Sequence, residues 1–256
     1  MFYSLCQWGN QFPWFWADQF SDSYRMSGDI KSSFNSDSSG VCKTAYCLNT
    51  GYAGVSVLTM IRKMREISAF QASGSWGTSS RFNGVWKMRY WQFTADMDML
   101  EIGTGTMTEF EEQTHFSFWA ALKSPLIIGA DITKISSTSL AILLNKEVIA
   151  ISQDDAGIAP TFLPNISVEG SVQVWAGPLS SQNSKCVILA LNYGNNSTEI
   201  TIPWGQIPTL QNFKSAQLKT RDVWAEQNLK TTGMEIKLLN VSSHQTKLLV
   251  LSAVQR

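Results

Sequence analysis

The chain has 256 residues, enough for one large domain or for one medium and one small domain, each with its own hydrophobic core. Its 20 Lys and Arg residues balance 20 Asp and Glu residues, and only 16% of all residues are charged. This composition argues against nucleic acid or an anionic membrane as partner, because both would require a basic face.

The histidines and cysteines bear on metal binding and on cellular location. His115 and His244 are the two histidines and lie far apart in the sequence, so a histidine-rich metal site is excluded and no cofactor is predicted. Cys42 and Cys47, in "VCKTAYC", suit a short disulfide if the chain is secreted, whereas Cys186 lies in an apolar run and is expected to be a buried thiol.

The amino terminus and the glycosylation sequons give conflicting indications of cellular location. The first twenty residues have no Lys or Arg before their apolar part, and Pro13 and Asp18 interrupt it, so they are not a signal peptide. No apolar run is long enough to span a membrane. Either the protein is cytosolic, or Met1 is an internal residue of a longer secreted protein. N-glycosylation sequons favour the second reading and begin at Asn165, Asn195, Asn196 and Asn240.

The first 155 residues alternate between strand and helix patterns. Residues 2–6 predict a short buried strand, and apolar side chains at helical spacing predict a helix within residues 48–70. Thr108 and Glu111 form a capping box before another helix. Residues 124–132, "SPLIIGADI", predict a strand buried on both faces, and "STSLAILLN" predicts a short helix. This alternation favours an α/β fold with a parallel sheet.

The pattern changes near "QDDAGIAP", residues 153–160. Short β-type runs follow at intervals of about ten residues, separated by turn residues, which is typical of an antiparallel sandwich. The predicted domains are therefore 1–158, of α/β type, and 159–256, a β-sandwich.

The stretch "SYRMSGDI" suggests a functional carboxylate. Arg25 and Asp29 are four residues apart, in a region that is rich in aromatics and hydroxyls but poor in charge. A general acid in a sugar-cleaving site needs a second carboxylate beside it. For a lone aspartate, the ordinary alternative is a turn or helix cap.

Several motifs in order resolve this alternative. "FYSLCQWG", "YRMSGDI", "DMDMLEIGTG", "HFSFWAALKSPLIIGADI" and "NKEVIAISQD" together closely resemble the α-galactosidases of glycoside hydrolase family 27, the fungal branch especially. The resemblance implies a (β/α)₈ TIM barrel followed by an antiparallel β domain. The chain would supply the carboxyl-terminal half of the barrel, strands five to eight, and the β-sandwich domain.

The resemblance also implies site residues. Asp29 matches the general acid/base, at the carboxyl end of a barrel strand, and its pKa must be raised for that role. Arg25 matches an arginine that binds the sugar near the reacting centre. Cys6 and Trp8 match pocket residues around the sugar's 2-position, although Gln7 stands between them where many members have Glu.

Two further positions follow from "DMDML". Asp98 matches a carboxylate that contacts sugar hydroxyls, and Met99 matches an apolar neighbour in the same pocket. The family's nucleophile is the Asp of a "KYDNC"-like segment at the end of the fourth strand, and no "YDNC" occurs in this sequence. A retaining mechanism needs both carboxyl groups, so the chain alone is expected to be an incomplete, inactive form.

The implied function is a retaining α-galactosidase that removes terminal α-D-galactose from oligosaccharides and galactomannans, secreted in its full-length form. The alternatives are a non-catalytic carbohydrate-binding remnant and an α-N-acetylgalactosaminidase, while a sandwich binding module with an unrelated extension is disfavoured by the order of the motifs. Relatives run from "SW" almost directly into "ADMDML", so residues 77–94 are an insertion. We expect this insertion to be a translated intron, the alternative being a substrate-binding or oligomerising loop.

Overall fold

The computed structural model describes residues 3–38, 53–68, 94–154, 156–179, 185–212, 218–229 and 234–253. The predicted disulfide between Cys42 and Cys47 lies outside these residues, and so does the predicted insertion apart from its last residue, Thr94, which begins a strand.

Three short parallel strands form the first sheet. They are β1 (Ser4–Leu5), β2 (Ser23–Arg25) and β3 (Thr94–Asp96), in the order β1-β2-β3. Parallel bridges between Ile30 and Val55 and between Leu100 and Ile128 extend this pattern beyond the strands. The parallel sheet predicted for this part of the chain is therefore confirmed.

Two expectations about strand burial are wrong. In β1, Ser4 is exposed and Leu5 only half-buried, because β1 is the edge of the described sheet. Residues 124–132 form no strand beyond the single bridge at Ile128, and Ile127 and Ile132 are exposed. An apolar run becomes a doubly buried strand only when other elements cover both of its faces, and the described residues do not provide that cover.

The helices begin at side-chain caps. Helix α2 (Val57–Ile67) is capped by Ser56, and its predicted apolar stripe is buried. Helix α3 (Glu109–Ala121) has the expected capping box of Thr108 and Glu111. Two shorter helices, α4 (Ser137–Leu143) and α5 (Lys146–Ser152), follow, and α5 was not predicted although Asn145 caps it. Short 3₁₀ helices complete the set: Pro13–Phe15, Ala17–Gln19, Pro164–Ile166, Trp204–Gln206 and Pro208–Asn212.

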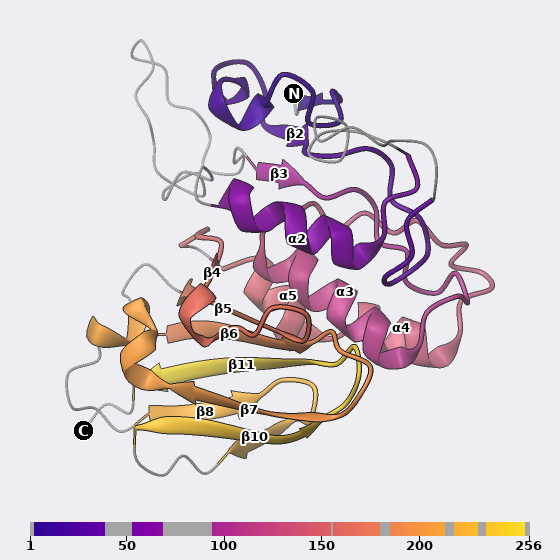
Figure 1. Cartoon of the computed structure of the whole chain (residues 1–256). Coiled ribbons are helices and arrows are strands. Elements are labelled where there is room, and N and C mark those ends of the chain that lie inside the picture. The colour runs from indigo at the N-terminus through magenta and orange to yellow at the C-terminus, as the bar shows by residue number, and fades with distance from the viewer. Residues whose placement is uncertain are drawn as a thin grey trace.

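The remaining strands make two antiparallel sheets (Figure 1). One sheet has the order β4-β5-β6-β11-β8-β9 and the other pairs β10 with β7. All of the predicted sandwich strands are present, whereas the short β4 and β9 were not predicted. The strands are β4 (Thr161–Phe162), β5 (Val172–Leu179), β6 (Lys185–Asn192), β7 (Thr198–Pro203), β8 (Leu218–Asp222), β9 (Gln227–Leu229), β10 (Glu235–Val241) and β11 (Thr246–Ala253).

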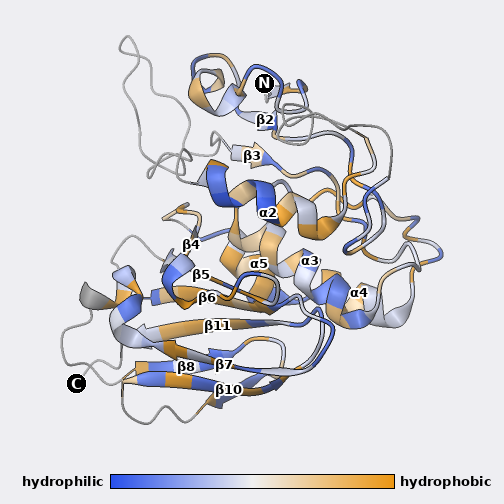
Figure 2. Cartoon of the chain, viewed as in Figure 1, coloured by the Kyte–Doolittle hydropathy of each residue, from blue (hydrophilic) through white to orange (hydrophobic). Residues whose placement is uncertain are grey.

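The central strands β5, β6 and β11 of the six-stranded sheet are largely apolar on both faces, as their orange colouring in Figure 2 shows. One face, with Val174 and Ile188, packs with residues of β7 and β10 in the sandwich core. The opposite face, with Trp175 and Leu189, shares a core with α2 and α3. Continuous apolar strands fit this doubly covered position, because side chains on both faces of the sheet are buried.

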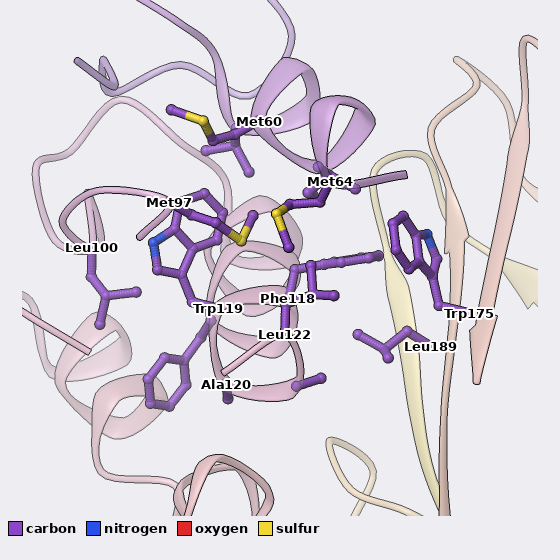
Figure 3. Packing of buried hydrophobic residues seen from close by; sticks show 14 of the residues in the cluster. Met60, Met64, Met97, Leu100, Phe118, Trp119, Ala120, Leu122, Trp175 and Leu189 are labelled. Atoms are coloured by element: carbon purple, nitrogen blue, oxygen red, sulfur yellow. The ribbon is translucent and has the colours of Figure 1, made fainter. Parts of the chain in front are cut away.

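Aromatic packing joins the helices to this sheet. The Phe118 ring of α3 meets the Trp175 ring of β5 edge to face, with 5.9 Å between centroids, and Figure 3 shows Met64 of α2 beside this contact. Arg62 of α2 lies over the Tyr193 ring, 5.2 Å from its centroid. Helix α3 therefore lies at the centre of one core shared by both halves of the chain (Figure 1).

Other expectations concern single residues. Cys186 is the predicted buried thiol, and burial raises its pKa to about 12. The four sequon asparagines, which are Asn165, Asn195, Asn196 and Asn240, are all exposed. In the described part of the chain, no helix has both the length and the apolar character needed to cross a membrane.

Phe118→Ala should lower the free energy of unfolding by about 3–5 kcal/mol, because it removes a fully buried ring from the shared core. Urea denaturation measures the change. Phe20→Ala is the matched control, since Phe20 is 70% exposed and its loss should change stability by less than about 0.5 kcal/mol. Equal effects of the two substitutions would contradict the proposed importance of the α3–β5 contact.

Candidate active site

An arginine at the end of β2 binds two aspartates. Arg25 Nη2 lies 2.6 Å from Asp98 Oδ2 and 3.1 Å from Asp29 Oδ1. The Arg25 side chain is only 13% exposed, so water screens this interaction less than it screens a surface pair. The structure thus brings together three of the residues that the sequence singled out.

Both carboxylate oxygens of Asp98 have hydrogen-bond donors. Its Oδ2 also accepts a hydrogen bond from Ile30 N at 2.8 Å, and its Oδ1 accepts one from Met99 N at 2.8 Å. Asp98 has a φ of 78°, which is unusual for a residue other than glycine, and its own N–H donates to Asp96 Oδ1 at 2.8 Å. Because Asp98 is 8% exposed and both of its oxygens accept hydrogen bonds, it is poorly placed to attack a substrate as a nucleophile.

Helix α3 holds the loop that carries Asp98. Trp119 Nε1 donates to the Asp98 carbonyl at 2.6 Å, His115 Nε2 accepts from Glu101 N at 3.0 Å, and Glu112 Oε1 accepts from Gly103 N at 2.8 Å. Residues 112, 115 and 119 are three and four apart, so they share one helix face. This role of the three residues was not predicted, although buried polar side chains at that spacing are the signal that could have revealed it.

Burial shifts the proton affinities in this loop. Burial raises the pKa of Asp96, partly opposed by the hydrogen bond from Asp98 N and by the Arg25 charge. Burial and the neighbouring Asp98 charge also raise the pKa of Glu101. His115 is fully buried, which lowers its pKa to about 3. His115 is therefore neutral, and since Nε2 accepts a hydrogen bond, the ring proton is on Nδ1.

Asp29 differs from its neighbours because its side chain is 54% exposed. Its backbone carbonyl accepts hydrogen bonds from Gly54 N at 2.8 Å and Val55 N at 3.0 Å, which fix its position in the chain. The charge-poor surroundings expected from the sequence are not found, because the Arg25 guanidinium binds the Asp29 carboxylate.

The other predicted site residues lie around this cluster. Trp8, half-buried with a φ of 54°, belongs to a turn that is joined to β2 by a hydrogen bond from Gly9 N to the Arg25 carbonyl at 3.0 Å. Cys6 is an exposed free thiol, and Met99 is 42% exposed. The buried Gln7 Oε1 has no hydrogen-bond partner among the described residues.

The cluster is a set of carboxylates around one cation rather than a metal site. Within the described ranges, no three His, Cys, Asp or Glu side chains are grouped so that they could hold a metal ion. The chemistry available to it is that of an exposed acid, Asp29, beside a fixed cation, Arg25, and a buried acceptor, Asp98.

Two family models match the chain. The model described as alpha galactosidase A matches residues 85–154, and the model described as alpha galactosidase C-terminal beta sandwich domain matches residues 169–251. An α-galactosidase from Lachancea cidri is 34% identical over 256 residues, which cover 95% of this chain and 50% of the relative. The chain thus spans about half the length of the curated relatives it matches.

Solved structures agree with these matches. Alpha-galactosidase I from Mortierella vinacea superposes with a TM-score of 0.81 at 32% identity, over 100% of this chain and 60% of that one. An α-galactosidase from Saccharomyces cerevisiae, solved with raffinose, superposes with a TM-score of 0.79 at 24% identity, over 99% of this chain and 64% of that one, and shows the fold alone.

These matches define the class as a glycoside hydrolase fold, the carboxyl-terminal half of a (β/α)₈ barrel followed by a β-sandwich. The chain contains two domains that match melibiase family models, it is homologous to α-galactosidases, and its structural neighbours include enzymes of glycoside hydrolase family 27. The resemblance and the fold class predicted from the sequence are therefore confirmed.

His115 should make the stability of the chain depend on pH. Its pKa is about 3 in the folded state and about 6.5 in the unfolded state, so the unfolded chain binds more protons between these values. Its contribution to stability is complete above about pH 6.5 and decreases as the pH falls toward 3, by at most about 1.4 kcal/mol per pH unit.

Urea unfolding across this pH range should show a weaker pH dependence for His115→Gln than for the unsubstituted chain. Gln keeps an acceptor for Glu101 N but cannot take up a proton in this range. Other titrating groups are common to both proteins, so the difference between the two curves isolates His115. Parallel curves would show that His115 is not a buried neutral imidazole.

Proposed function

We propose that this chain supplies the acid/base and sugar-binding half of a retaining α-galactosidase site. The observation that carries the proposal is the bridge from Arg25 to both Asp29 and Asp98, which joins three residues that match the family motifs and lie up to 73 positions apart. The matches to melibiase family models and the homology to α-galactosidases support the reaction class.

In this mechanism Asp29 acts as the proton donor and acceptor. Its exposed carboxyl group would protonate the departing glycosidic oxygen and later remove a proton from the attacking water. Arg25 and Asp98 would bind sugar hydroxyl groups, and the fixed Arg25–Asp98 pair would orient them relative to Asp29. Cys6, Trp8 and Met99 would line the pocket.

The nucleophile must come from elsewhere. A retaining glycosidase needs a second carboxyl group about 5–5.5 Å from the first, on the other side of the reacting carbon. Asp98 cannot easily fill this role, because hydrogen bonds and Arg25 already occupy its oxygens. We place the nucleophile in the part of the relatives' length that this chain does not span, so turnover requires that part.

The substrate proposed is a terminal, non-reducing α-D-galactose residue in an oligosaccharide or a galactomannan. The raffinose bound to the Saccharomyces cerevisiae homologue is consistent with an α-galactoside substrate. The exposed sequons support a secreted glycoprotein. We place the domain division near residue 158, between α5 and the first sandwich strand, with residues 1–158 as barrel and 159–256 as sandwich.

A non-catalytic carbohydrate-binding remnant is the second candidate, because the sequence contains no "YDNC" segment. The two candidates predict different hydrolytic activities for a longer protein that contains this chain and a nucleophile. A chimaera of the amino-terminal part of the Mortierella vinacea enzyme with this chain should hydrolyse p-nitrophenyl α-galactoside if the half-site is competent. The 256-residue chain alone should release no p-nitrophenol above the rate in buffer.

Asp29→Asn in such a longer protein should reduce kcat/KM for melibiose, an unactivated galactoside, by about 10²–10⁴-fold, because general acid catalysis contributes that much. The loss on p-nitrophenyl α-galactoside should be smaller, since its leaving group needs little protonation. Asp18→Asn, at an exposed aspartate in a 3₁₀ helix, is the control and should leave both rates unchanged. Equal losses on both substrates would count against the acid role.

A further inference from the structure

A second cavity lies away from the Arg25 cluster, between α5 and the six-stranded sheet. Its volume is about 320 Å³, at the lower end of the range of about 300–1,000 Å³ typical of small-molecule sites. Ala150 and Ile151 of α5 form one apolar wall, and Leu179 and Val250 of the sheet form the other.

Hydrogen-bond donors lie in one row across this sheet. Ser252 of β11 pairs in register with Lys185 of β6 on one side and with Lys219 of β8 on the other. Neighbouring strands are about 4.8 Å apart, so the two lysines flank the serine on one face of the sheet. All three side chains line the cavity, and they have no ion pair or side-chain hydrogen bond within the described ranges.

The acidic groups of the cavity are engaged elsewhere. Glu147 of α5 binds Arg221 of β8 through two hydrogen bonds, of 2.7 Å and 3.1 Å, so their charges cancel. Asp154 interacts electrostatically with the buried Lys123 ammonium, whose Nζ donates to the Ile151 carbonyl. Neither acid of the cavity therefore forms an ion pair with Lys185 or Lys219, whose two positive charges face the cavity together with the Ser252 hydroxyl.

We propose that this cavity binds a small oxyanion, a phosphate or carboxylate group on a molecule of about monosaccharide size. Two ammonium groups and a hydroxyl supply charge-assisted and neutral hydrogen bonds to the anionic oxygens. The Asn228 amide extends the polar side, and the apolar walls suit the body of the ligand. The cavity also lies where the helical half meets the sandwich, so a bound ligand would stabilise that junction.

Isothermal titration of the 256-residue chain with inorganic phosphate, D-galacturonate and neutral D-galactose tests the proposal. Phosphate or galacturonate should bind saturably at this site, and galactose should not. Binding of phosphate alone would show that the ligand bears a phosphate group. Binding of galacturonate alone would show that it bears a carboxylate group. Lys185→Gln/Lys219→Gln should weaken binding by at least about tenfold, because each loses a hydrogen bond to a charged group.

The matched control is Lys134→Gln/Lys237→Gln, which removes the same charge from exposed lysines outside the cavity. It should change the affinity by less than about twofold. Equal weakening in both double variants, or no saturable binding of either anion, would overturn the proposal.

Acetylation footprinting of the unsubstituted chain gives a second readout that does not depend on the variants folding. Phosphate or galacturonate should protect Lys185 and Lys219 from acetylation and leave Lys134 and Lys237 unprotected. Uniform protection of all four lysines, or none, would also overturn the proposal.

Discussion

The Arg25 guanidinium holds the candidate active site together, because it is the only cation among the described residues that contacts both Asp29 and Asp98. The two aspartates come from different β–α connections, and without the cation their charges would repel each other at close range. The pair with Asp98 is the more buried, so removing Arg25 would leave a carboxylate that only backbone N–H groups stabilise. The positions of the proposed acid and of the proposed sugar contact both depend on this side chain.

Helix α3 links this cluster to the rest of the molecule. One of its faces, with Glu112, His115 and Trp119, binds the loop of Asp98 through backbone groups. Another face packs Phe118 against Trp175, and Thr114 donates to the His244 carbonyl in the turn before β11 at 2.7 Å. A single helix of 13 residues thus contacts both the loop that carries Asp98 and the sandwich. A change in how the sandwich packs on α3 would therefore displace the loop that carries Asp98.

The sequence predicted those parts of the fold that depend on local patterns. The stripe of Met60, Ile61 and Met64 and the Thr108 capping box each depend on neighbouring residues, and the structure has both. Residues 124–132 show the limit of prediction from local patterns. Burial of Ile127 and Ile132 depends on which elements cover them and not on their own apolar character. The motifs assigned site roles to Arg25, Asp29 and Asp98. They contained His115 and Trp119 but gave them no role, because that role depends on contact with a loop that the motif itself does not include. The surroundings of Asp29 were also predicted to be poor in charge, whereas the Arg25 guanidinium binds its carboxylate.

The role of Asp29 is tested most directly by the anomeric configuration of a rescued product. Asp29→Gly in a longer protein that includes the proposed nucleophile would be incubated with p-nitrophenyl α-galactoside and azide, and the galactosyl azide identified by NMR. If Asp29 is the acid/base, azide attacks a covalent intermediate in place of water, and the product is the α-azide with retained configuration. The β-azide would mean that azide replaced a missing nucleophile, and it would contradict the assignment of Asp29 on which the proposed mechanism depends.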